Sequence, residues 1–113
     1  MDLKPYQDKL GFTREQLAEH LEVSRSTLYE WDEMGAPYWV EYALKGLRAA
    51  LVLPHLAIPM LGPDLMRART ALKLSQADFS HRLGISRRTV SRWENDTPPS
   101  WLSYAVIALA ILD

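Results

Sequence analysis

The chain repeats itself: when its 113 residues are shifted by 62 positions, the first part aligns with the second without a gap. Thirteen positions are then identical, including two tryptophan pairs, Trp31 with Trp93 and Trp39 with Trp101. The other identical pairs are Asp2 and Asp64, Leu3 and Leu65, Leu10 and Leu72, Leu21 and Leu83, Ser24 and Ser86, Arg25 and Arg87, Thr27 and Thr89, Pro37 and Pro99, Tyr42 and Tyr104, Ala43 and Ala105, and Leu47 and Leu109. Two tryptophan pairs in register are hard to obtain by chance. We therefore predict an internal duplication, with repeats at 1–51 and 63–113.

The two repeats are joined by residues 52–62, "VLPHLAIPMLG", which are apolar and contain Pro54 and Pro59. Because proline restricts the backbone, we expect this linker to be packed and stiff rather than a flexible tether.

Each repeat is predicted to be all-helical. In the second repeat, apolar spacing and proline positions predict helices over 64–74, 76–82, 87–94 and 100–112. Ser75 and Ser86 precede two of these helices as N-caps, and Gly84 lies where a helix C-terminus favours glycine.

The first repeat carries the same signals in register. Thr13 and Ser24 are the expected N-caps, and a last helix is expected over 38–51. Glu22 occupies the position of the turn glycine.

Composition narrows the classes of function. The chain has no cysteine, which fits a reducing cytoplasm and excludes disulfides and thiolate metal sites. Its three histidines are dispersed and no nucleophile–base motif occurs, so we expect no metal, no cofactor, no small-molecule ligand and no enzyme activity. The longest apolar run, at 105–112, is too short to span a membrane.

The net charge of −1 conceals two unlike parts. Residues 1–48 hold six Lys or Arg and nine Asp or Glu, whereas residues 49–113 hold seven and five. A polyanion responds to local charge, so only the second part is expected to attract one.

The stretch "ISRRTVSRWEN" at 85–95 predicts a short helix with two different faces. Its apolar members, Ile85, Val90 and Trp93, must face the core. The exposed side then carries Arg87, Arg88, Ser91 and Arg92. Such a helix fits the major groove of B-DNA, where arginine can bind guanine O6 and N7 together.

Residues 74–95, "LSQADFSHRLGISRRTVSRWEN", resemble the helix-turn-helix of the lambda-repressor-like family (Cro/cI-type, XRE). The resemblance implies an all-α fold, with a five-helix domain that the internal repeat extends to two tandem copies. On this basis residues 63–113 are expected to be the DNA-binding copy. Residues 1–51 are expected to be a second copy, which is acidic in composition and degenerate in its motif.

The resemblance and the exposed helix face together give the candidate contacts. Candidate base contacts are Ser86, Arg87, Arg88, Ser91 and Arg92. Candidate phosphate contacts are Ser75, Gln76 and Asn95, two of which begin a helix where free amides favour anions. The resemblance also implies an ion pair between Arg69 and Glu94. Asp96 departs from the family, which usually has glycine there, so the following turn must be built differently.

The first repeat departs further from the family. Arg14 replaces the glutamine, Ser26 and Glu30 replace two arginines, and Gln7 with Asp32 replaces the ion pair. The candidate secondary DNA contacts are Arg14, Ser24, Arg25 and Ser26.

The last helix is apolar all round, which indicates that two of its faces are buried. We expect the second face to meet the first repeat, the linker or a second subunit. The residues proposed for this dimer or inter-repeat packing are Trp101, Leu102, Val106, Ile107, Leu109, Ile111 and Leu112.

These features predict a sequence-specific transcriptional regulator of a bacterium or phage, cytoplasmic and bound to double-stranded DNA. We expect a repressor that binds a pseudo-palindromic operator as a homodimer through a recognition helix at 86–94. One alternative uses both repeats of a single chain on two half-sites. Another is a protein-binding adaptor, an antitoxin or a phage inhibitor of a host factor, using the acidic repeat or the apolar last helix.

Overall fold

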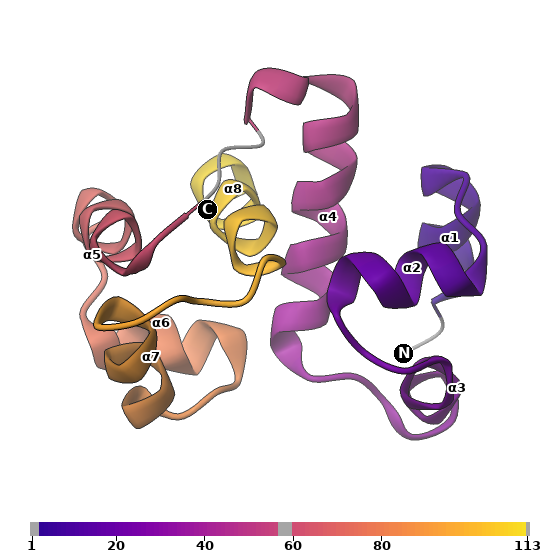
Figure 1. The fold of residues 1–113 in the computed structure, drawn as a ribbon, viewed down its shortest axis with the longest axis horizontal. Coiled ribbons are helices and arrows are strands. Elements are labelled where there is room, and N and C mark those ends of the chain that lie inside the picture. Colours follow the sequence, from indigo (N-terminus) through magenta and orange to yellow (C-terminus); the bar gives the residue numbers. More distant parts are fainter. Residues whose placement is uncertain (1–2, 57–59, 113) are drawn as a thin grey trace. The chain divides into compact units, whose positions relative to one another are not determined.

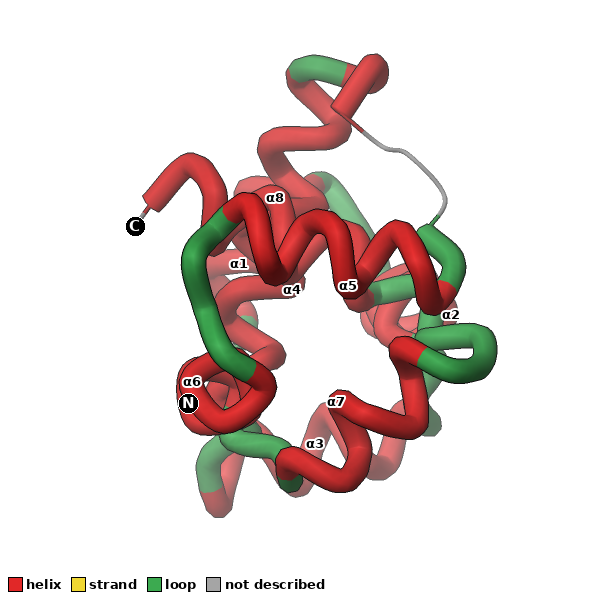
Figure 2. The backbone as a smooth tube through the Cα atoms, turned by 90° about the vertical axis from the view of Figure 1, so that its left-hand side faces the viewer, coloured by secondary structure: helices red, strands yellow, loops and turns green. Residues whose placement is uncertain are grey.

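The computed structural model describes residues 3–56 and 60–112, and all regular structure in these ranges is helical (Figures 1 and 2). The predicted all-α class is therefore confirmed. None of the helices in the described ranges has the length and apolarity that crossing a membrane requires.

The chain divides into two compact units, residues 1–36 and 37–113. The first unit contains α1 (Lys4–Leu10), α2 (Arg14–Leu21) and α3 (Arg25–Met34). The second contains α4 (Tyr38–Val52), the 3-10 helix η1 (Pro54–Leu56), α5 (Gly62–Ala71), α6 (Gln76–Leu83), α7 (Arg87–Glu94) and α8 (Leu102–Leu112).

These units do not follow the boundaries expected from the repeat, because α4 groups with the second unit rather than with residues 1–36. Helix α4 packs along α8, and the two lie side by side in Figure 1. At Gly46 the backbones touch, since a Cβ there would lie 1.6 Å from the carbonyl oxygen of Tyr104. The described part of each predicted repeat carries four α-helices, not five. Division into two repeats remains a prediction.

The linker at 52–62 is only partly regular. Helix α4 ends at Val52, η1 occupies Pro54–Leu56, and α5 begins at Gly62, one residue before the predicted repeat boundary. Residues 57–59, including Pro59, lie outside the described ranges, so the expected stiffness of the linker remains a prediction.

The predicted capping residues are confirmed. Thr13, Ser24, Ser75 and Ser86 each accept a hydrogen bond from the backbone amide three residues onward. This satisfies one of the amides that have no partner within the helix. Gly84 ends α6 at φ 68°, in the left-handed region where a Cβ is unfavourable.

Candidate nucleic-acid interface

One face of α7 is anchored in its unit. Val90 is fully buried, and Trp93 meets Trp101 edge to face at 5.6 Å between ring centroids. Such aromatic pairs favour one orientation of the rings. The anchored face fixes which side of α7 points outward.

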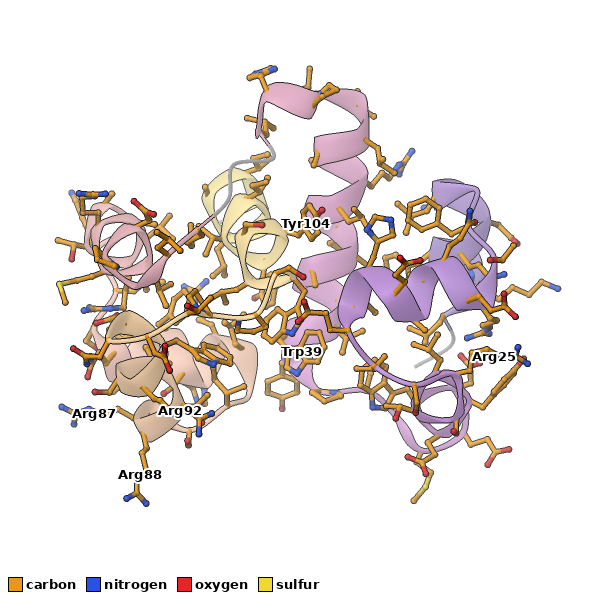
Figure 3. All side chains as sticks on the ribbon, in the orientation of Figure 1. Arg25, Trp39, Arg87, Arg88, Arg92 and Tyr104 are labelled. Carbon is orange, nitrogen blue, oxygen red and sulfur yellow. The ribbon has the colours of Figure 1, made fainter. Side chains whose placement is uncertain are left out.

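The outward face of α7 carries three exposed arginines: Arg87, Arg88 and Arg92. Figure 3 shows the side chains of Arg87 and Arg88 extending away from the ribbon of α7. Among the residues that the structure describes, none of the three is ion-paired with a carboxylate. Their charges are therefore available to an external anion.

These arginines belong to one open hollow of about 620 Å³. It is lined by Gln76, Arg87, Arg88, Ser91, Arg92 and Asn95. The structure thus gathers six of the eight candidate base and phosphate contacts on one surface formed by α6 and α7.

The other two candidates, Ser75 and Ser86, are engaged as helix caps. The Ser75 hydroxyl accepts from the amide of Asp78 at 3.0 Å, and the Ser86 hydroxyl from the amide of Thr89 at 3.1 Å. A DNA contact by either side chain would have to use a hydroxyl group that already accepts the capping hydrogen bond of its helix. Their DNA contacts remain predictions.

Beneath the hollow, Glu94 joins three helices. Arg69 on α5 donates through Nε to Glu94 Oε2 at 2.5 Å and through Nη2 to Oε1 at 3.2 Å. Gln76 at the start of α6 donates through Nε2 to Glu94 Oε1 at 3.0 Å. Arg69 also donates through Nη1 to the carbonyl of Leu74 at 2.9 Å.

The Glu94 side chain is only 1% exposed, so its charge depends on these donors. Burial alone would raise the pKa of Glu94, but hydrogen bonds from Arg69 and Gln76, with the Arg69 charge, hold the pKa below its usual value. The hydrogen bond to Glu94 in turn raises the pKa of Arg69. The pair is therefore ionised at neutral pH and ties α7 to α5 and α6.

Residues 65–102 match the family model of the helix-turn-helix, of the XRE/lambda repressor-like type. The matched segment begins in α5, contains α6 and α7, and ends at the first residue of α8. Such a helix-turn-helix is typical of DNA-binding regulators. No curated protein and no solved structure matches the chain.

Sequence reasoning missed two supports of the helix-turn-helix. Gln76 was expected at phosphate, yet its side-chain amide is the second donor to Glu94. A buried carboxylate needs several hydrogen-bond donors. The need of Glu94 for a donor besides Arg69 could have predicted the contact with Gln76. Gly62 was also missed: a Cβ there would lie 2.4 Å from the carbonyl oxygen of Glu94, so α5 begins against the end of α7.

The first unit uses its cations differently. Arg14 pairs with Asp32 at 2.6 Å, and its side chain is 19% exposed and lies over the Tyr29 ring. These contacts argue against Arg14 as a DNA contact. The expected pairing of Asp32 with Gln7 is wrong, because Asp32 takes Arg14 and the amide of Leu3 instead.

The three other secondary candidates lie at the start of α3. Arg25 pairs with Glu15 at 2.8 Å, with both side chains exposed. Ser26 is exposed, and the Ser24 hydroxyl caps the helix. An exposed ion pair contributes little to stability, so Arg25 can leave Glu15 to bind a phosphate or a base instead.

Proposed function

We propose that the chain is a sequence-specific DNA-binding transcriptional regulator, with residues 86–94 as the recognition helix in the major groove. The observation that carries this proposal is the set of three exposed arginines around one open hollow, Arg87, Arg88 and Arg92, which have no carboxylate partner among the residues that the structure describes. Arginine can bind guanine O6 and N7 together, which gives sequence discrimination. The family match supports a DNA-binding regulator over the adaptor alternative.

Gln76 and Asn95 flank the arginines in the same hollow, and we propose that they approach phosphate. Phosphate contacts fix the register of a protein on the duplex without reading its sequence. Asn95 already donates through Nδ2 to the carbonyl of Ser91 at 2.8 Å, which holds it at the end of α7.

We further propose that the regulator is a repressor in the cytoplasm of a bacterium or a phage-infected bacterium. Occupying promoter DNA is sufficient to repress and requires no second activity. A pseudo-palindromic operator bound by a homodimer is one way to present two recognition helices about 34 Å apart. The packing of α8 on α4 of the same chain favours a different arrangement.

Selection from a random pool of DNA duplexes tests the proposed function. We expect the full chain to enrich one motif containing guanines. The logarithm of its binding constant should fall linearly with the logarithm of salt concentration, because released counterions drive phosphate binding. Binding that enriches no motif, at affinities equal to those for unrelated duplex, would contradict sequence-specific regulation.

We also propose that the two repeats are structurally equivalent, and one shared network supports this. Helices α2 and α6 begin at 14 and 76 and end at 21 and 83, each 62 residues apart. The network positions are also 62 apart: Gln7, Arg14 and Asp32 in one repeat, and Arg69, Gln76 and Glu94 in the other. Arginine and glutamine have exchanged places, and the acid pairs with whichever position holds the arginine.

Equivalence predicts a rescue. Arg14→Gln should lower the free energy of unfolding by about 2 kcal/mol, because Asp32 loses a charged hydrogen-bond donor in a partly buried site. Adding Gln7→Arg should restore at least half of the lost free energy of unfolding. The second substitution supplies an arginine at the position that corresponds to Arg69. Chemical denaturation of the full chain, with Gln7→Arg alone as control, measures the cycle. A double variant no more stable than Arg14→Gln would contradict equivalence.

A further inference from the structure

Helix α8 has its second apolar face covered by α4 of the same chain. Trp39, at the start of α4, stacks on Trp101 with ring centroids 3.9 Å apart and planes at 15°. Further along, Gly46 lets the α4 backbone approach Tyr104 directly. Leu102 and Leu109 on α8 are almost completely buried. Figure 3 labels Trp39 and Tyr104 on these two neighbouring helices.

The tryptophan stack joins two positions that are counterparts in the sequence. Trp39 and Trp101 are 62 residues apart, which is the shift that aligns the repeats. In a twofold-symmetric dimer, a residue near the axis contacts its own copy in the partner subunit. Here a residue contacts its own counterpart within one chain. Helix α4 thus occupies the place that the partner's last helix would take in a homodimer.

We propose that the α4–α8 packing replaces a subunit interface, so that one chain supplies both recognition helices and binds an operator with two unlike half-sites. This inference rests on the proposed DNA-binding function. A second copy cannot use the same face of α8, because α4 already covers it. Of the described side chains of α8 from Leu102 on, only Ala110 and Ile111 remain exposed.

The two recognition helices differ in charge at equivalent positions. Arg25 on α3 corresponds to Arg87 on α7, but Ser26 and Glu30 stand where α7 has arginines. Helix α3 can thus offer one arginine, once its exposed pair with Glu15 is exchanged for DNA. Glu30 can accept from cytosine N4 and prefers a different base from its arginine counterpart. Helix α7 therefore contributes most of the affinity and α3 a smaller part.

The stoichiometry of the complex is the first test. Light scattering is measured on the 12.9 kDa chain with its selected duplex. We expect one chain per duplex and a selected motif that is not an inverted repeat. Two chains on an inverted repeat would overturn this inference while leaving the proposed function intact. A chain that binds no duplex would instead contradict the proposed function.

The variant Arg25→Ala tests the second recognition helix on the same duplex. We expect it to weaken binding about tenfold, the loss of one guanine contact, with unchanged stoichiometry. The control is Lys9→Ala, which removes one exposed positive charge from α1 of the same unit and should change affinity less than threefold. Equal effects of the two variants would show that α3 makes no specific contact, and the inference would be overturned.

Discussion

The double variant Arg88→Ala/Arg92→Ala is expected to bind its specific DNA duplex at least about 30-fold more weakly than the unaltered chain does. Each bidentate contact between arginine and guanine contributes roughly 1–3 kcal/mol of discrimination, so the loss of two removes most of it. Both side chains are exposed and free of carboxylate partners in the described structure, so the fold should be unaffected. A gel shift on the selected duplex measures the binding, and circular dichroism checks the fold.

Arg67→Ala is the matched control for charge. Arg67 is an exposed arginine on α5 that pairs with Asp64, and it does not line the hollow. Its removal should alter binding only through overall charge, by less than threefold. If the double variant binds the duplex as tightly as the unaltered chain does, the assignment of α7 as the recognition helix is wrong.

Gly46→Ala should strongly destabilise the second unit. A Cβ at this position would lie 1.6 Å from the Tyr104 carbonyl oxygen, so the α4 and α8 backbones must separate. We expect a loss of about 3 kcal/mol, at the upper end for overpacked sites. Alanine has the higher helix propensity, by about 1 kcal/mol, so the substitution by itself should stabilise α4. A net loss of stability would therefore arise from the contact between α4 and α8. Thermal and chemical denaturation measure the change.

Arg48→Ala provides a control in the same helix. Arg48 is exposed, so its replacement should shift stability by no more than about 0.5 kcal/mol. A Gly46→Ala chain as stable as the Arg48→Ala chain would show that α4 and α8 do not meet backbone to backbone.

The local features of the helix-turn-helix could be predicted because short stretches of sequence determine them. Ser75 and Ser86 cap their helices, and α7 spans the predicted 87–94. Caps depend on residues three positions apart, and a helix face on a period of 3.6. The exposure of Arg88 and the burial of Val90 follow from that period.

Long-range pairings could not be predicted in the same way. Sequence periodicity shows that α8 has two apolar faces but not which element covers the second one. The partner of Asp32 was missed because the repeat register pairs Asp32 with Gln7, the counterpart of Arg69. In the fold, the arginine at the neighbouring network position, Arg14, takes Asp32 instead. The close approach at Gly46 does not change the periodicity of the sequence. A single glycine within a helix can have several structural reasons, so it does not by itself predict a contact between helices.

The most direct test of the central claim is methylation interference at guanine N7 on the selected duplex. Guanine N7 lies in the major groove and accepts from arginine, so a methyl group there blocks the contact. For the unaltered chain we predict a small set of guanines at which methylation prevents binding, and for Arg88→Ala the loss of one of them from that set. Identical interference patterns for the two proteins, or no interference at any guanine, would contradict base recognition by α7.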